Sequence, residues 1–326
     1  MIRTRLTELL NIDHPVISAP MAGAGGGALA AAVSEAGGLG LIGGGYGMPD
    51  WIDQQFEIAG NRLVGAGIIT WRLSDNPDVL DHILAHRPKA MMLSFDDPRP
   101  WAAKVHAAGA KLICQVQDVE GAKMAVDAGA DVIVAQGTAA GGHGAIRSTI
   151  TLVPEVADLL ASRAPGIVPV AAGGIGDGRG LAAALSLGAE GVLMGSRFWA
   201  TSDALVADGL QQKSVAATGD QTLATSVVDI VRGFDWPEQY KLRVLDTGFV
   251  SDWHGREDVM RQATAESNAM ANAYQQALDA GDPAGAAVIV GEATGLISDI
   301  PDAATIMARI VTEAEKILAA QASRIA

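Results

Sequence analysis

The 326-residue sequence predicts a (β/α)8 barrel, the TIM-barrel architecture of the α/β class, with an excursion after the eighth strand and a C-terminal helical cap. Two observations lead to this prediction. Short apolar runs alternate with Ala-rich helical runs, and eight such pairs fit within about 200 residues, the usual scale of this barrel. The apolar runs are also continuous rather than alternating, as parallel strands covered on both faces are. A doubly wound open sheet is the alternative.

The eight expected strands are apolar runs bounded by glycine, proline or charged residues, which is typical of buried strands. They are PVISAP from Pro15, LGLIGG from Leu39, LVGAGII from Leu63, AMMLSF from Ala90, LICQV from Leu112, VIVAQG from Val132, VPVAAGG from Val168 and GVLMGS from Gly191.

Seven helices are expected between these strands. Several begin with proline near the first turn, where its missing N–H costs nothing. The expected helices are Ala28–Ala36, Pro49–Ala59, Pro77–His86, Pro100–Ala108, Val119–Ala128, Pro154–Arg163 and Gly178–Leu187.

The pattern changes after Ser202. Residues 214–256 form an excursion that contains Trp236, Tyr240, Phe249 and Trp253, and the chain beyond it has helical periodicity. We expect residues 1–213 with 257–326 to form the barrel and its helical cap, and residues 214–256 not to be an independent domain. The excursion could be a lid over the site, a dimer contact or ordinary core.

Composition excludes several classes of function. The net charge is −14 without a basic cluster, which argues against nucleic acids and anionic membrane surfaces as partners. Cys114 is the only cysteine, so no internal disulfide forms. The N-terminal residues contain no long apolar signal-peptide region, and no run has the bulk of a spanning helix. We expect a cytoplasmic protein, and the sequence leaves open whether it forms a homo-oligomer.

Glycine-rich loops are expected at the carboxyl ends of the strands, where such barrels carry their active sites. AAGGIGDGRG from Ala171 follows the seventh strand, and MGSRF from Met194 follows the eighth. The loops after these two strands form a recurrent phosphate site, so the pair predicts a phosphate-bearing ligand; either loop alone could be a tight turn. Asp177 is expected to cap the next helix. GGIGDG is out of register with GxGxxG, which disfavours a Rossmann dinucleotide site.

His143 stands among glycines in AQGTAAGGHGAIRS, directly after the sixth strand. A neutral imidazole there could abstract or position an acidic C–H proton, since its pKa is close to neutrality. A loop histidine that bonds a carbonyl is an equal alternative.

Other reactive side chains carry weaker signals. His82 and His86 have the i, i+4 spacing of a metal pair, but no third ligand is evident, so a solvated helix face and no metal site are expected. Cys114 lies inside a strand and is expected to be a buried, inert thiol. Asp96-Asp97 end the fourth strand and could contact substrate or cap a helix.

Together these motifs resemble the nitronate monooxygenase family, which are FMN enzymes on a (β/α)8 barrel. PVISAPMAG, AQGTAAGGHGA, PVAAGGI and LMGSRF carry the resemblance, which covers about two-thirds of the chain. It implies that alkyl nitronates or nitroalkanes are oxidised with O2 to a carbonyl compound and nitrite, with His143 as catalytic base or substrate-positioning group. The implied FMN-binding residues are Ala19, Met21, Gly67, Gln115, Gln136, Gly141, Gly142, Gly173, Gly174, Leu193, Met194, Gly195 and Ser196.

The chain departs from the family pattern at two places. Ala139-Ala140 stand where the motif carries a glutamate before AGGH, and Gly67 stands where an asparagine often contacts the flavin. An NAD(P)H:quinone reductase of the same superfamily is the first alternative. An enoyl-acyl-carrier-protein reductase is disfavoured because that partner is also acidic. A flavin- or phosphate-binding protein without turnover is the rival from another class.

Overall fold

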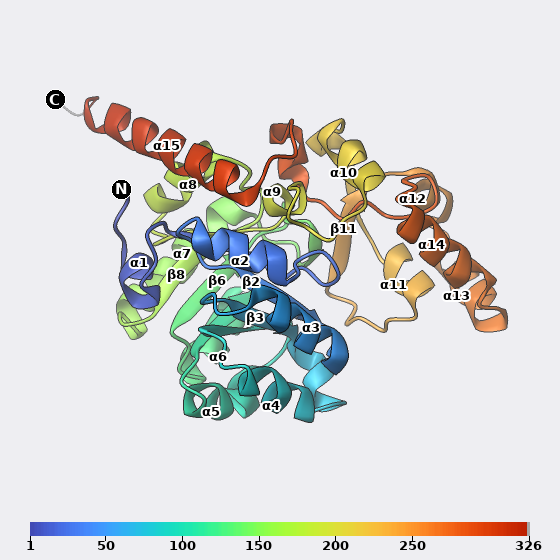
Figure 1. Ribbon diagram of the computed structural model, residues 1–326, viewed down its shortest axis with the longest axis horizontal. Helices are drawn as coiled ribbons and strands as arrows, with labels where there is room; N and C mark the ends of the chain where they lie inside the picture. The colour runs from blue at the N-terminus through green and yellow to red at the C-terminus, as the bar shows by residue number, and fades with distance from the viewer. Residues whose placement is uncertain (325–326) are drawn as a thin grey trace.

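Eight parallel strands form a nearly closed barrel in the computed structural model, which describes residues 1–324 (Figure 1). Their order around the barrel is β1-β9-β8-β6-β5-β4-β3-β2. A parallel bridge between Ile17 and Leu39 joins the two ends of this order, and the Ser18 amide donates to the Leu39 carbonyl at 3.0 Å. The expected (β/α)8 barrel is confirmed. Its strands are β1 (Val16–Ser18), β2 (Leu41–Gly45), β3 (Gly65–Ile69), β4 (Ala90–Ser94), β5 (Lys111–Val116), β6 (Val132–Gln136), β8 (Val168–Ala172) and β9 (Val192–Met194).

The seven expected helices are all present outside the barrel. Only one boundary differs clearly: the helix with Pro154 begins at Thr149, because the Ser148 carbonyl already accepts from the Leu152 amide at 2.9 Å. Asp177 caps α8 as expected, accepting from the amides of Arg179 and Gly180. The helices are α2 (Gly27–Glu35), α3 (Pro49–Ala59), α4 (Asp78–Ala85), α5 (Arg99–Ala107), α6 (Val119–Asp127), α7 (Thr149–Arg163) and α8 (Gly178–Ser186).

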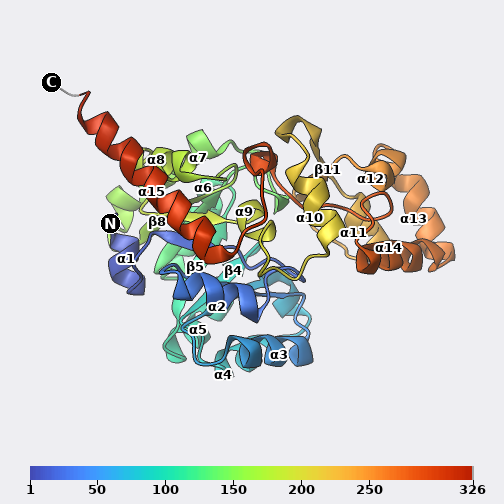
Figure 2. The same ribbon diagram turned by 45° about the horizontal axis from the view of Figure 1, so that its top comes forward.

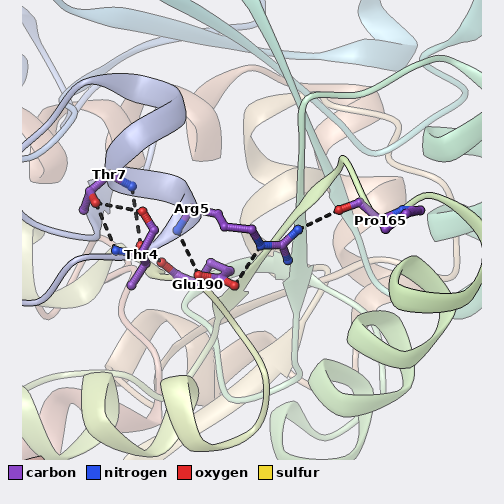
Figure 3. Close-up of polar contacts among 5 residues, drawn as sticks. All are labelled: Thr4, Arg5, Thr7, Pro165 and Glu190. Carbon is purple, nitrogen blue, oxygen red and sulfur yellow. Dashed lines mark hydrogen bonds and ion pairs between the residues drawn. The ribbon is translucent and has the colours of Figure 1, made fainter.

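A short N-terminal helix, α1 (Arg5–Leu10), closes the amino-terminal end of the barrel and was not predicted. Its Leu6 and Leu10 are fully buried against the side chains of the barrel interior. A capping box begins it, and Arg5 binds both Glu190 and the carbonyl of Pro165 in the loops before β9 and β8 (Figure 3). With this end plugged, only the carboxyl ends of the strands can open to a ligand.

A second unit lies beside the barrel, at the right of Figures 1 and 2. We call it the side lobe; it comprises residues 222–289, and the strand β7 (Gly142–Gly144), which follows β6 at the rim of the barrel, pairs with it. β7, β11 (Lys241–Leu245) and β10 (Thr222–Thr225) form an antiparallel sheet, none of which was predicted. The sheet is covered by α11 (Val227–Arg232), α12 (Gly248–Trp253), α13 (Glu257–Glu266) and α14 (Ala269–Ala280).

The side lobe has its own hydrophobic core. Val228 and Val244 pack there with Met260 and Tyr274, so side-chain packing crosses residue 256, where the expected excursion ends. The division of the chain at that residue stays a prediction. Phe249 and Trp253 pack at the edge of this core.

The remaining elements lie outside the barrel sheet and the side lobe. The long helix α15 packs against α8 and α2 (Figure 1). Within residues 1–324, no helix is long and apolar enough to cross a membrane. The cytoplasmic location stays a prediction. The remaining elements are α9 (Ser196–Trp199), α10 (Asp208–Val215), α15 (Ala303–Ala322) and the 3-10 helices η1 (Thr70–Ser74), η2 (Gly219–Gln221) and η3 (Glu292–Leu296).

Candidate active site

A cavity opens between the carboxyl ends of the barrel strands and the side lobe. Its floor consists of small residues and backbone from the barrel, while Trp236, Arg232 and Leu242 of the lobe form the opposite wall. The residues predicted from the sequence that line it are Ala19, Met21, Gly67, Gln115, Gln136, Gly141, Gly142, His143, Gly195 and Ser196.

Four predicted residues do not line the cavity. Leu193 packs in the barrel interior and Met194 packs between strands and helices, so their side chains face away from it. Gly173 and Gly174 lie in the adjoining loop after β8, against Gly137 and Ala139. Their contacts with a cofactor stay predictions that depend on backbone atoms.

His143 lies on β7, opposite Leu242 of β11, rather than on a free loop. A buried glutamine cluster fixes its backbone: the Gln136 side-chain amide donates to the His143 carbonyl at 3.0 Å. The Gln136 Oε1 in turn accepts from Gln115 at 3.1 Å and from Gln117 at 2.9 Å. The barrel rim therefore determines where the histidine stands.

The His143 side chain pairs with Asp229 of α11. Its Nε2 lies 3.0 Å and 3.1 Å from the two carboxylate oxygens, and the two side chains are only 9% and 5% exposed. Burial lowers the pKa of His143 below its usual value, and the hydrogen bond to Asp229 acts in the opposite direction. The imidazole is therefore neutral near pH 7. With Nε2–H donating to the carboxylate, Nδ1 keeps its lone pair.

Aromatic side chains surround this histidine. Trp236 stacks on the imidazole, with 3.4 Å between ring centroids and 11° between planes. Phe95 meets both rings edge-on. Phe95 also has φ = +66°, a conformation that costs a non-glycine residue free energy and that clusters at functional sites. Of the three roles open for the aromatic excursion, the structure assigns Trp236 to the cavity wall.

Tyr46, directly after β2, lines the same cavity. Its hydroxyl oxygen accepts from the Trp236 Nε1–H at 3.0 Å, which leaves the hydroxyl proton available for donation. Burial raises the pKa of Tyr46 to about 12. The phenol stays protonated at physiological pH and can act as a hydrogen-bond donor but not as a base.

Unpaired backbone amides gather where β8 and β9 end. Within residues 1–324, the N–H groups of Gly174 and Ile175 donate to no protein acceptor. Gly173 and Gly174 both have positive φ, +99° and +76°, so successive amides form a concave anion-binding surface. The backbone N–H groups in the first turn of α9, beginning with Ser196, have no acceptor within the helix. These groups suit a phosphate.

The cavity fits a flat cofactor with a phosphate group. A Cβ at Gly67 would lie 2.4 Å from the Pro20 ring. There is therefore no space at this position for a side chain such as the asparagine that the family often has. A Cβ at Gly142 would meet nothing within 4 Å, because that backbone faces open space. Such bare backbone lets a planar ring approach main-chain atoms closely.

Other candidate residues lie outside the cavity. Asp97 does not line the cavity; it accepts from the Arg99 backbone amide at 3.0 Å and pairs with the Arg99 guanidinium, but the N-cap residue of α5 is Pro98. Cys114 is 1% exposed within β5, and burial raises the pKa of its thiol to about 12, which confirms an inert thiol. Asp53 lies beside both His82 and His86, so the fold provides a possible third ligand that was not evident in the sequence, and the expectation of no metal site stays a prediction.

Sequence reasoning missed Asp229, Trp236 and Tyr46 as site residues. Asp229 is 86 residues from His143 along the chain, and no local motif links the two. The clustered aromatic residues of the excursion were the only signal for Trp236.

Comparison with known proteins identifies the family. The nitronate monooxygenase family model matches residues 3–64 and 66–313. The curated nitronate monooxygenase npaC of Metarhizium robertsii is 36% identical, over 93% of this chain and 91% of that protein. A (3aS,4S,5R,7aS)-5-hydroxy-7a-methyl-1-oxo-octahydro-1H-indene-4-carboxyl-CoA dehydrogenase of Mycobacterium tuberculosis is 34% identical over 70% of this chain and 64% of that protein.

Solved structures give the same fold. The structure of FabK from Thermotoga maritima superposes with a TM-score of 0.87 at 32% identity, and both chains are covered completely. A nitroalkane oxidase from Streptomyces ansochromogenes superposes with a TM-score of 0.78 at 23% identity, over 96% of this chain and 99% of that one. The match to the family model spans nearly the whole chain, and the chain is therefore a member of the nitronate monooxygenase family and a flavin-dependent oxidoreductase.

Proposed function

We propose that this protein is an FMN-dependent nitronate monooxygenase, which oxidises alkyl nitronates and nitroalkanes with O2 to carbonyl compounds and nitrite. The observation that supports this most is the neutral His143 imidazole, held by Asp229 beside a glycine-floored cavity. A neutral base next to a redox cofactor suits a substrate that loses a C–H proton together with electrons.

Two parts of the cavity would hold FMN. The free amides of Gly174, Ile175 and Ser196 would bind the phosphate, and the bare backbone at Gly67 and Gly142 would lie against the ring system. Bound FMN supplies the chemistry of accepting electrons from the substrate and passing them to O2. The remaining predicted contacts would come from Ala19, Met21, Gln115, Gln136, Gly141, Gly173, Leu193, Met194 and Gly195.

His143 would act as base through Nδ1. Within residues 1–324 this nitrogen makes no hydrogen bond to the protein, and the residue lines the cavity. Nδ1 takes the acidic C–H proton of a neutral nitroalkane, and Asp229 stabilises the imidazolium that results. A preformed nitronate has already lost this proton, so it needs His143 only for positioning.

Two further groups would orient the substrate. The Tyr46 hydroxyl can donate to an oxygen of the nitro or nitronate group, because its own lone pair already accepts from Trp236. The Arg232 guanidinium lies over the Tyr46 ring, 5.6 Å from its centroid, and lines the cavity. A cation at this place favours an anionic substrate despite the acidity of the whole chain.

Enoyl-acyl-carrier-protein reduction is the second candidate, because the FabK structure matches this chain over its full length. The surface near Trp236 is not uniformly basic, because Lys241 and Arg261 lie there together with Asp235 and Glu238. Such mixed charge disfavours binding of an acidic carrier protein. Reduction of quinones by NAD(P)H is a third candidate from the same superfamily, and a flavin-binding protein without turnover is the fourth.

Anaerobic mixing of the FMN-loaded protein separates these activities. We expect propyl nitronate to bleach the flavin absorbance near ~450 nm, and nitrite to appear when air is admitted. Rapid bleaching by NADH without nitronate would favour a reductase, with a quinone or an enoyl thioester as the second substrate. A protein that binds no FMN on reconstitution would contradict all three enzymatic candidates.

A further inference from the structure

A cluster of metal-ligand side chains lies on the outer wall of the barrel, away from the cavity. Asp53 belongs to α3, His82 belongs to the next helix, α4, and His86 is the residue directly after α4. These helices pack beside each other (Figure 2). The Asp53 Oδ1 lies 2.8 Å from His82 Nε2 and 2.6 Å from His86 Nε2. The structure thus supplies the third ligand that the i, i+4 histidine pair lacks in the sequence.

We propose that Asp53, His82 and His86 bind one divalent transition-metal ion of the zinc class, with water completing its coordination. Two imidazoles and a carboxylate are a common ligand set for Zn²⁺. All three ligand atoms lie within 4.8 Å of one another. Tetrahedral Zn²⁺ with bonds of about 2.0–2.1 Å needs its ligand atoms roughly 3.3 Å apart, so the Asp53 oxygen needs to move only slightly away from each histidine nitrogen.

The three side chains are already held close together at this place. His86 Nε2 makes a hydrogen bond with Asp53 Oδ1 at 2.6 Å, and His82 Nε2 lies 2.8 Å from the same oxygen. His86 is held in place by Phe56, which stacks on it at 4.4 Å with 2° between planes.

The three side chains are partly exposed to solvent, although the Nε2 atom of His82 itself is buried. The side chains of Asp53, His82 and His86 are 51%, 34% and 28% exposed. A bound ion would join α3 to α4. Both helices follow segments that line the cavity. Tyr46 lies in the segment before α3, and Ile69 lies before η1 and α4. The ion would therefore brace one side of the cavity without contacting the reacting atoms.

Zinc titration of the full-length protein tests the proposal directly. The protein is produced without a polyhistidine tag, treated with chelator, dialysed, and titrated with Zn²⁺ in a calorimeter. We expect one ion per chain. Asp53→Asn, His82→Gln and His86→Gln should each weaken binding at least about tenfold, since each removes one of three ligands.

His106→Gln is the matched control. His106 lies on the neighbouring helix α5 near one carboxylate only, with its Nε2 3.6 Å from Asp131. This variant should bind zinc as the wild type does. Flavin content and circular dichroism establish that each variant is folded, and zinc should raise the melting temperature of the wild type but not of His82→Gln.

Two results would overturn the proposal. One is the absence of stoichiometric zinc binding by the wild-type protein. The other is zinc affinity that is unchanged in the folded Asp53→Asn variant, or reduced equally by His106→Gln. Binding is read directly from heat and melting temperature, so the outcome does not depend on the proposed oxidation of nitronates.

Discussion

The carboxylate of Asp229 and the imidazole of His143 form a buried pair that joins the side lobe to the rim of the barrel. The Nε2 atom lies 3.0 Å and 3.1 Å from the two carboxylate oxygens. The barrel supplies the backbone position of His143 through Gln136, and the lobe supplies its tautomer through Asp229. Both units are therefore needed to hold His143 in the state that can accept a proton.

Replacing Asp229 by asparagine should lower kcat/KM for a neutral nitroalkane by about 10²- to 10⁴-fold, the range that one acid–base group contributes. The amide no longer selects the tautomer with a free Nδ1 and does not stabilise an imidazolium. Steady-state kinetics with nitroethane and with propyl nitronate measure the effect, which should be much smaller for the nitronate. The exposed Asp252→Asn of α12 is the control and should behave as wild type. Equal losses for both substrates would contradict the assignment.

Activity should fall at acidic pH with the titration of His143. Burial lowers the pKa of this residue below 6.5, so the imidazole is neutral above that pH and accepts a proton. The kcat/KM for a neutral nitroalkane should be constant around neutral pH and decrease as pH falls below 6.5. An apparent pKa above 6.5 would show that the pair with Asp229 outweighs burial.

The free energy of unfolding should also decrease at acidic pH. A histidine whose pKa is lowered in the folded state binds its proton more readily in the unfolded chain. Its contribution to stability is present above the unfolded pKa, near 6.5, and is lost as pH falls through the lower folded value. Denaturant titrations of wild type and His143→Gln should show a steeper loss below pH 6.5 for the wild type.

Replacing Tyr46 by phenylalanine should raise KM for propyl nitronate about tenfold, as expected for one hydrogen bond to a charged group. The change removes the hydroxyl that donates into the cavity and leaves the Trp236 Nε1–H without its partner. Tyr274→Phe is the control, because Tyr274 is a buried tyrosine in the core of the side lobe. A Tyr46→Phe variant with unchanged KM would remove this residue from substrate binding.

Replacing Gly174 by alanine should lower retention of FMN. Gly174 has φ = +76°, and the new Cβ would lie 3.1 Å from the Ala139 side chain, so the loop with the free amides must shift. Gly255→Ala is matched in strain, with φ = +80° and open space around it. The flavin-to-protein ratio after dialysis should fall in the first variant and not in the second. Equal ratios would contradict a phosphate site in the loop after β8.

The barrel could be predicted because burial on both faces of a parallel strand produces a continuous apolar run. β4 and β6 are such runs, and every residue in them is buried. β7 escaped prediction because its sequence, GHG, has no apolar pattern; its partner β11, far along the chain, makes it a strand. The glycine loops and His143 could be predicted from local sequence.

The partners of the histidines could not be predicted in this way. Asp229 and Asp53 are single acidic residues on helices α11 and α3, and only the folded chain places them beside His143 and His86. The same holds for Trp236, whose stacking on His143 depends on where the side lobe docks on the barrel. Such pairings are properties of tertiary structure and leave no spacing in the sequence.

The most direct test of the central claim is the anaerobic rate of flavin reduction in His143→Ala, measured with neutral nitroethane and with preformed propyl nitronate. If His143 is the base, the variant keeps its FMN, loses about 10²- to 10⁴-fold of the rate with nitroethane, and retains most of the rate with the nitronate. A wild-type rate with nitroethane, or the same loss with both substrates, would contradict it.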